Sequence, residues 1–325
     1  MNTHGSLEGF HDLSPSTAEF RASVINGLSS PRKNLPCKYF YDTEGSRLFD
    51  KICEQPEYYP TRTEYSILRR HNVDIAEHIG PQATLVEFGS GAGIKIRLLL
   101  TALAHPAAYI PVDIAQEYLL TAALDLSKHF PTLCIAPICA DYTKPFRLPT
   151  IAGATTATYT GFFPGSTIGN FTPMEATAFL SRTRHLLGAG SMMIVGIDLL
   201  KDETILTKAY NDAAGITAAF NLNLLARINR ELQGTFELSQ FAHKAVWNDA
   251  LSRIEMHLVS NCRQYVFVGN HRFDFTTGET IHTENSYKYS FEQFRHLAGQ
   301  AGYDPIACWT DSNKLFSVHL LRTLQ

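Results

Sequence analysis

Apolar and polar positions along the chain alternate between short continuous apolar runs and segments with helical periodicity. Continuous runs of four to eight apolar residues predict buried strands, and apolar residues at every third or fourth position predict helices. From residue 64 to residue 200 the two kinds of segment follow one another repeatedly. The predicted strands are 83–89, 107–113, 133–141, 154–166 and 191–199, and the predicted helices are 64–79, 94–103, 115–130 and 172–187.

Strands that alternate with helices at this spacing favour a parallel sheet covered by helices on both faces. Thr172-Pro173 is a typical helix start for the last of these helices. The final part of the chain predicts a helix at 291–303 and two strands, 305–311 and 314–322, joined by a short turn. We therefore expect an α/β fold with a doubly wound sheet.

The regular alternation lapses between residues 200 and 288. There, residues 209–232 predict one helix, and 253–261 with 263–275 predict an antiparallel pair of strands. The simplest organisation is a sheet domain that the chain leaves and re-enters. The predicted domains are residues 62–200 with 288–325, and an α+β domain of residues 10–61 with 201–287.

The composition of the chain argues against several classes of function. The 325 residues are 45% hydrophobic with a net charge of −3, and no run of lysine and arginine supports a nucleic-acid partner. No stretch approaches the roughly 18 apolar residues of a membrane span, and the first thirty residues hold no apolar signal core. The six cysteines include no Cys-x-x-Cys pair, and no histidine spacing indicates a metal. We expect a cytoplasmic, monomeric protein with reduced thiols, without a metal or a membrane partner.

A glycine-rich turn, "EFGSGAG" at 87–93, follows the first strand of the sheet domain. In open parallel sheets ligands bind beyond the carboxyl ends of the strands, where the strand order reverses. Only Ala92 separates Gly91 from Gly93, whereas the dinucleotide fingerprint needs two residues between its second and third glycines. The turn predicts a ligand other than a dinucleotide, with a ligand-free turn and a nicotinamide enzyme as the alternatives.

Acidic residues mark the same strand ends. Glu87 precedes the glycines, Asp113 ends the next strand and Asp141 the one after it. A carboxylate in the position of Asp113 commonly accepts the hydroxyls of a ribose. Asp141 suits an exocyclic amine, and Tyr142 offers a surface on which a base can pack. This pattern is similar to that of Rossmann-like methyltransferases that use S-adenosylmethionine, and it favours that cofactor.

Segments outside these strand ends carry a closer resemblance. They are "CKYFYDTEGSRLFD" (37–50), "QPEYYPTRTE" (55–64), "FFPGSTIGNFTP" (162–173), "LKDETILTKAYNDAAGITAAFN" (200–221), "RIEMHL" (253–258) and "GETIHTENSYKYS" (278–290). Over nearly the whole chain they resemble the histidine Nα-methyltransferases of ergothioneine biosynthesis, a family with a fungal branch that acts on a prenylated tryptophan. The resemblance implies three methyl transfers from S-adenosylmethionine to the α-amino group of L-histidine, which give Nα,Nα,Nα-trimethylhistidine (hercynine).

The resemblance also implies roles for single residues. Tyr58 and Asn170 would hold the reacting amine, and Asn170 with Tyr210 the substrate carboxylate. The imidazole would lie at Tyr41, Met256, Glu284 and Ser286. The implied cofactor-binding residues are Glu87, Gly89, Ser90, Gly91, Lys95, Asp113, Asp141 and Tyr142. One departure stands in the cofactor loop, where Ile96 follows Lys95 in place of the family's usual threonine.

The residue types fit an imidazole. A neutral imidazole presents one donor and one acceptor, which Glu284 and Ser286 can complement. The two residues are two apart, so in an extended strand their side chains point the same way. Indole has a single donor and cannot satisfy both. Methylation of another aromatic amino acid, such as a tryptophan derivative, and a non-catalytic sensor of S-adenosylmethionine or histidine are the alternatives.

Overall fold

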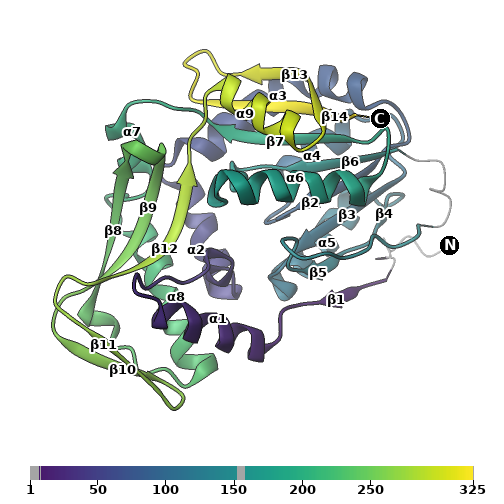
Figure 1. The fold of residues 1–325 in the computed structure, drawn as a ribbon. Helices are drawn as coiled ribbons and strands as arrows, with labels where there is room; N and C mark the ends of the chain where they lie inside the picture. The colour runs from purple at the N-terminus through teal and green to yellow at the C-terminus, as the bar shows by residue number, and fades with distance from the viewer. Residues whose placement is uncertain (1–6, 8, 152–157, 325) are drawn as a thin grey trace. The chain divides into compact units, whose positions relative to one another are not determined.

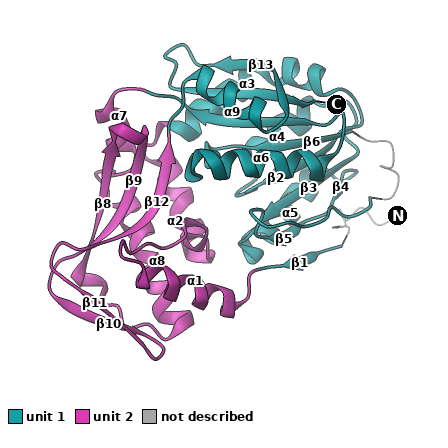
Figure 2. Cartoon of the chain, in the orientation of Figure 1, with its two compact units in different colours: residues 1–14, 60–200, 288–325 teal, residues 15–59, 201–287 magenta. Residues whose placement is uncertain are grey.

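The structure is a computed structural model that describes residues 7, 9–151 and 158–324, and the chain forms two compact units (Figure 2). Unit 1 comprises residues 1–14, 60–200 and 288–325, and unit 2 comprises residues 15–59 and 201–287. The first strand, β1 (His11–Leu13), pairs with β5 of unit 1. Unit 2 therefore starts at residue 15 and not at residue 10, where the sequence placed the start of the second domain.

Unit 1 is built on one large sheet whose strand order is β1-β5-β3-β2-β6-β7-β14-β13, with β4 beside β3 (Figure 1). Its pairings are parallel except those of β14, which runs antiparallel to β7 and β13. From β2 the chain proceeds through β3 to β5 on one side and then crosses to β6 and β7 on the other side, so the strand order reverses between β2 and β6. The carboxyl end of β2 is thus the switch point at which such sheets bind ligands.

The central strands of this sheet are buried on both faces, as expected of a parallel sheet covered by helices. The remaining strands of unit 1 are β2 (Thr84–Phe88), β3 (Ala108–Asp113), β4 (Cys134–Ile135), β5 (Ile138–Ala140), β6 (Tyr159–Phe163), β7 (Met192–Asp198), β13 (Tyr303–Thr310) and β14 (Phe316–Thr323). The predicted doubly wound sheet is confirmed. Residues 154–157 of the predicted strand 154–166 lie outside the described residues.

One prediction for this sheet was wrong in detail. The single strand expected at 133–141 is two short strands, β4 and β5, separated at Ala136-Pro137. Proline has no N–H to donate to a neighbouring strand, so the ladder is interrupted there. Both short strands still pair with β3, and Asp141 still follows the second of them.

Two helices of this part of the chain begin with strong local signals. Thr172 caps α6 in a capping box with Glu175, and a proline follows it, as the sequence predicted. Ser290 and Gln293 form a second capping box at the start of α9, which packs beside α6. The helices are α3 (Tyr59–Ile79), α4 (Ile94–Ala102), α5 (Gln116–His129), the short η2 (Thr167–Asn170), α6 (Pro173–Leu187) and α9 (Phe291–Gln300).

The chain leaves and re-enters unit 1 through two paired segments. The amide of Tyr289 donates to the carbonyl of Asp198 at 3.2 Å, and the amide of Leu200 donates to the carbonyl of Tyr289 at 3.1 Å. Lys288 and Asp198 form an ion pair of 2.7 Å in which neither side chain is exposed. Removing one partner of such a pair leaves a buried charge without compensation, at a cost of about 3–5 kcal/mol.

Unit 2 combines helices with two small antiparallel sheets. The first sheet has the order β12-β9-β8 and the second is the hairpin β10-β11. Helix α8 packs against β8 and β9, and α2 packs against α8. The elements are α1 (Thr17–Ser29), η1 (Cys37–Phe40), α2 (Thr43–Glu54), α7 (Glu203–Ala209), α8 (Ile216–Leu232), η3 (Leu238–Gln240), β8 (Phe241–Asn248), η4 (Asp249–Leu251), β9 (Arg253–Ser260), β10 (Gln264–Val268), β11 (His271–Phe275) and β12 (Thr280–Tyr287).

Two sequence predictions for unit 2 were wrong. The helix expected at 209–232 is interrupted, because the Asp212 carboxylate accepts hydrogen bonds from the amides of Ile216 (2.8 Å) and Thr217 (2.7 Å) and so starts α8 afresh. Residues 263–275 do not pair with β9 but fold back on themselves as β10-β11. The strands that flank β9 are β8, which the sequence pattern missed, and β12.

Within the described residues, no helix has both the length and the apolar character that crossing a bilayer would require.

Candidate functional site

The glycine turn after β2 has an open side. Gly89, Gly91 and Gly93 all adopt positive φ angles, of 73°, 49° and 66°, which glycine tolerates far better than other residues. A Cβ added at Gly91 would meet no atom within 4 Å. Beside it, the hydroxyl of buried Ser90 has no hydrogen-bond partner. A buried hydroxyl without a partner is costly, so this turn has the features of a ligand-binding loop.

Asp113, at the end of β3, is tied to this turn. Its carboxylate accepts hydrogen bonds from the amide of Gly91 at 3.2 Å and from the amide of Ala115 at 3.0 Å. Burial raises the pKa of Asp113, although hydrogen bonds from backbone amides act in the opposite direction. Asp141 lies one strand further along the same edge of the sheet, and its carboxylate accepts from the amide of Thr143 at 3.0 Å.

Glu87 is placed differently from the other acidic residues. It lies within β2, is 2% exposed, and accepts a hydrogen bond of 2.5 Å from the hydroxyl of Tyr109. Burial raises its pKa to about 8, because the effect of burial is larger than the lowering by the Tyr109 hydrogen bond and the charge of Lys95. Glu87 is therefore largely protonated at neutral pH and bound to Tyr109, and its predicted contact with a cofactor stays a prediction.

Lys95, in the first turn of α4, forms an ion pair with Glu64 of α3. Glu64 is fully buried and also accepts a hydrogen bond of 2.8 Å from the amide of Gly165. A Cβ at Gly196 of β7 would lie 2.0 Å from the other carboxylate oxygen of Glu64, so only glycine fits there. Sequence analysis missed Glu64. It connects the predicted cofactor lysine to the loop that leads to Asn170.

Asn170 is the last residue of η2, and Tyr142 follows the end of β5. Asn170 does not cap the next helix, because Thr172 does so. The Tyr142 ring lies 3.8 Å from the position that a Cβ of Gly89 would occupy, and it contacts Phe163 edge-on at a centroid distance of 5.7 Å. Tyr142 thus stands beside the glycine turn, where the sequence predicted a packing surface for a base.

The other six predicted substrate residues all belong to unit 2, and contacts or mutual electrostatic effects link them. The hydroxyl of Tyr210 lies 2.6 Å from the Ser286 hydroxyl, and both residues are buried. Glu284 is directly opposite Met256 in the β12-β9 pair. Burial raises the pKa of Tyr58 well above 10, and neighbouring acidic groups that include Tyr210, Tyr41 and Glu284 raise it further.

Two phenylalanines also belong to this cluster. The sequence analysis did not predict them as site residues. Phe49 of α2 contacts both Tyr41 and Tyr58 edge-on, at centroid distances of 5.8 and 6.2 Å. Phe220 of α8 contacts Tyr41 at 5.8 Å and Phe49 at 6.0 Å. These rings form one aromatic group, which Tyr58 links to Tyr210 at a centroid distance of 6.2 Å. No local signal marks them, because an apolar residue on an amphipathic helix is usually core.

The comparison with known proteins decides the family. The profile of the family described as "Histidine-specific methyltransferase, SAM-dependent" matches residues 20–323. The chain belongs to this family. A histidine N-alpha-methyltransferase of Mycolicibacterium smegmatis is 39% identical over 321 residues, which cover 97% of this chain and 98% of that protein.

More distant relatives also match most of this histidine-specific methyltransferase chain. Ergothioneine biosynthesis protein 1 of Neurospora crassa is 29% identical over 92% of this chain and 34% of that protein. A 4-dimethylallyltryptophan N-methyltransferase of Claviceps purpurea is 26% identical over 92% of this chain and 93% of that protein. The family resemblance and the dependence on S-adenosylmethionine that the sequence predicted are thereby confirmed.

Ile96, the departure from the family pattern, is fully buried in the hydrophobic core of unit 1, which also contains Leu99 and Leu85. The ethyl group that isoleucine carries in place of the threonine hydroxyl therefore adds to the packing of α4 on the sheet. A hydroxyl at this position would have to find a partner among apolar side chains.

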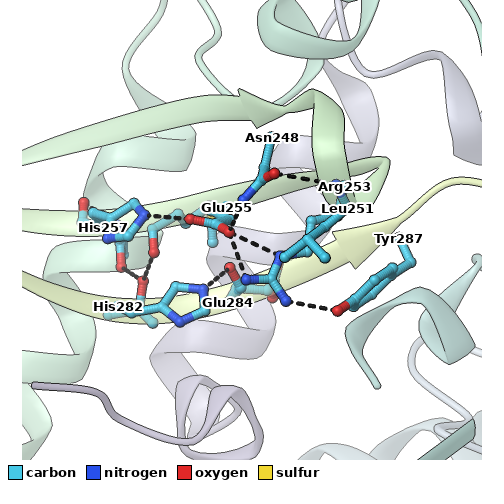
Figure 3. A network of polar contacts seen from close by, with 11 residues as sticks. Asn248, Leu251, Arg253, Glu255, His257, His282, Glu284 and Tyr287 are labelled. Carbon is cyan, nitrogen blue, oxygen red and sulfur yellow. Dashed lines mark hydrogen bonds and ion pairs between the residues drawn. The ribbon is translucent and has the colours of Figure 1, made fainter. Parts of the chain in front are cut away.

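The histidine-specific methyltransferase chain has one group of metal-ligating side chains close together within its described residues: Glu255, His257 and His282, with ligand atoms within 4.8 Å of one another (Figure 3). Burial raises the pKa of Glu255, but hydrogen bonds from Arg253, Asn248 and His257 outweigh it and lower the pKa to about 2. Arg253 donates to Glu255 at 2.5 Å, and Lys244 is directly opposite His257. Since two cations already face this group, we assign it a structural role on the sheet.

Proposed function

We propose that this chain transfers methyl groups from S-adenosylmethionine to the α-amino group of L-histidine, three times in succession, for ergothioneine biosynthesis. The observation that carries the proposal is the cluster of unit 2. Glu284 lies opposite Met256, and Ser286 is hydrogen-bonded to Tyr210, in a chain 39% identical to a histidine N-alpha-methyltransferase. These side chains supply the two polar contacts and the apolar wall that an imidazole ring needs.

The polar groups complement a neutral imidazole. Glu284, as a carboxylate, accepts the ring N–H. Ser286 donates its proton to the unprotonated ring nitrogen. In the structure its hydroxyl lies 2.6 Å from that of Tyr210, and either hydroxyl can be the donor of that contact. A site built in this way rejects rings that lack these atoms, because its buried polar groups would be left unpaired. An indole ring, with a single donor and no acceptor, would leave Ser286 without its acceptor.

The amine has to lose its proton before it can accept a methyl group. The raised pKa of Tyr58 keeps its phenol neutral, so this side chain holds the amine without favouring the ammonium form strongly. The amide of Asn170 is uncharged at every pH and has the same property. We assign both residues to orienting the amine, and we assign its proton to water, because no dedicated base stands among the proposed substrate residues.

Unit 1 has the features needed to hold the methyl donor. The partnerless Ser90 hydroxyl and the open side of Gly91 suit a ligand that approaches the backbone, and Asp113 suits the ribose hydroxyls. We assign Asp141 and Tyr142 to the adenine ring. When bound, S-adenosylmethionine supplies a sulfonium-activated methyl group. The protein's contribution is then orientation and the exclusion of water.

Mass spectrometry tests the proposal directly. The purified protein is incubated with S-adenosylmethionine and, in separate reactions, with each of the 20 standard amino acids. A mass increase of three methyl groups on histidine alone is expected. Methylation of tryptophan or tyrosine in place of histidine would overturn the imidazole assignment and favour the branch that acts on tryptophan derivatives. Binding of S-adenosylmethionine without any product would favour a sensor.

A further inference from the structure

Strand β12 contains one extra residue at the edge of the proposed imidazole site. His282 is opposite His257 of β9, and Glu284 is opposite Met256, so Thr283 has no partner of its own on β9. This is a β-bulge, which inserts one residue into a strand and shifts its alternation of faces. The position of the bulge therefore decides on which face of the sheet every later side chain of β12 lies.

The two faces of the sheet differ sharply. We call the face that carries Ile254, Met256 and Leu258 the inner face, because these residues are buried, and the face that carries Glu255 and His257 the outer face. In an antiparallel pair, residues directly opposite each other share a face.

The register then places the proposed imidazole ligands. Ile281 is opposite Leu258 on the inner face, so strict alternation would put Glu284 and Ser286 on the outer face. In the structure they are opposite Met256 and Ile254 and therefore lie on the inner face. The extra residue, Thr283, accounts for this difference.

A buried chain of hydrogen bonds fixes the bulge from the inner face. The hydroxyl of Thr283 lies 2.8 Å from the side-chain oxygen of Asn221 and 3.1 Å from the carbonyl oxygen of Met256. Asn221 is fully buried in α8, and its amide nitrogen donates to the carbonyl of His257 at 3.1 Å. The same nitrogen lies 2.9 Å from Nδ1 of His243.

His243 completes the chain in a single tautomer. Its Nε2 lies 2.9 Å from the carbonyl oxygen of Tyr210, which can only accept, so Nε2 carries the proton and Nδ1 accepts from Asn221. Burial lowers the pKa of His243, which favours this neutral form. The chain thus runs from the backbone of Tyr210 through His243 and Asn221 to Thr283, and both of its ends adjoin proposed substrate residues.

The other side of the bulge is fixed by His282. Its Nε2–H donates to the carbonyl of Glu284 at 3.0 Å (Figure 3). Its backbone is held as well, since the amide of Leu35 donates to its carbonyl and its own amide donates to the carbonyl of Lys33, both at 2.9 Å. The residue before Thr283 is therefore anchored, and Thr283 is the point at which the register shifts.

We infer that Thr283, held by Asn221, is a positioning residue that keeps Glu284 and Ser286 on the inner face and thereby sets the preference for an imidazole ring. The inference rests on the proposed histidine methylation. Neither Thr283 nor Asn221 contacts the substrate in this assignment. They act by holding the strand register from which the imidazole ligands project.

The test compares two substitutions at one position. Thr283→Val keeps the branched shape and removes the hydroxyl, which leaves the buried oxygen of Asn221 without its donor, whereas Thr283→Ser keeps the hydroxyl. For Thr283→Val we expect kcat/KM for histidine to fall about tenfold, mainly through KM, as losing one buried hydrogen bond predicts. In one reaction that contains both amino acids, the amount of methylated tryptophan should rise relative to that of methylated histidine. Thr283→Ser should stay within threefold of wild type.

Two further readouts and a third variant separate positioning from general destabilisation. The Kd for S-adenosylhomocysteine, which reports on unit 1, should change less than twofold in each variant. Thr283→Ala removes the hydroxyl without any risk of overpacking, and it should reproduce the loss of selectivity if Thr283→Val does not fold. Circular dichroism at the assay temperature confirms that each variant is folded.

The outcomes distinguish this inference from the proposed function. A wild-type chain that does not methylate histidine overturns both. A wild-type chain that does, with unchanged selectivity in folded Thr283→Val or Thr283→Ala, overturns the inference alone. Equal losses in Thr283→Ser and Thr283→Val would also overturn it, because the hydroxyl would then not be the cause.

Discussion

In unit 1 the candidate ligand-binding residues stand at the carboxyl ends of parallel strands, whereas in unit 2 most of them lie on one face of an antiparallel sheet and on the segments around it. The first arrangement depends on where strands end, and glycines and acidic residues mark those ends in the sequence. The second depends on which way side chains point, and one inserted residue reverses that. A site at strand ends therefore tolerates small errors of register, and a site on a sheet face does not.

The largest expected effect belongs to unit 1. Asp113→Ala removes the carboxylate that accepts from the amide of Gly91, and with it the proposed ribose contacts. Hydrogen bonds to charged groups contribute about 1.5–3 kcal/mol each, so losing two or more should weaken S-adenosylhomocysteine binding by about 1000-fold. Isothermal titration calorimetry measures this. Asp113→Asn, which keeps the shape and one acceptor, is the matched control and should lose less. Histidine binding that weakened as much as cofactor binding would contradict a division of labour between the units.

The double variant Glu284→Ala with Met256→Val tests the inner face of unit 2. Losing the carboxylate that accepts the ring N–H and shortening the wall beside it should lower kcat/KM for histidine about 100-fold and admit larger aromatic amino acids. Competition between histidine and tryptophan in one reaction, followed by mass spectrometry, reports the selectivity. Met256→Val alone serves as the control. Unchanged histidine kinetics in the double variant would mean that the imidazole binds elsewhere.

Asn170 is the proposed substrate residue that belongs to unit 1. Asn170→Ala removes the amide assigned to the amine and the carboxylate, and we expect kcat/KM for histidine to fall about 30-fold, from the loss of hydrogen bonds to charged groups. The Kd for S-adenosylhomocysteine should be unchanged. Steady-state kinetics at saturating S-adenosylmethionine measures the effect. Near-normal turnover would contradict the assignment.

The last prediction concerns stability in place of ligand binding, and it is made for Glu87. Its pKa is raised by burial from 4.5 to about 8, so between these values the unfolded chain has released a proton that the folded chain retains. The contribution of the protonated form to the free energy of unfolding is fully present below about pH 4.5. It is lost as pH rises through 8, and the loss is no more than about 1.4 kcal/mol per pH unit. Glu87→Gln mimics the protonated form and should flatten the decline between pH 5 and pH 8. Urea unfolding at several pH values measures the slope, and equal slopes in the two proteins would refute the raised pKa.

The elements of unit 1 could be predicted because buried parallel strands are continuous apolar runs, and the strand end at Asp113 followed from that. The burial of Glu64 could not be predicted, because nothing in the local pattern of α3 shows that an acidic residue will meet Lys95 and Gly196. Pro137 is visible in the sequence, but a continuous apolar run does not by itself show that a proline divides it into β4 and β5.

Unit 2 was predicted less well for a different reason. The expectation that Glu284 and Ser286 point the same way is compatible with their partners on β9, but the sequence does not show which face they share. That depends on Thr283, and a bulge leaves no signature when the residue is an ordinary threonine in an extended run. The break between α7 and α8 was missed for a related reason, since Asp212 starts α8 through hydrogen bonds that only the folded chain displays.

The discontinuous make-up of unit 1 has a consequence during synthesis on the ribosome. Strand β7 needs β14 as its neighbour, but β14 is made roughly 120 residues later, which at about 5–20 residues per second leaves β7 waiting for on the order of ten seconds. During this time the apolar edge of "MMIVGID" has no partner on that side, and such an edge is prone to pair with another chain. We expect this strand to be a point at which the nascent protein depends on chaperones, and slower translation before β14 to increase aggregation.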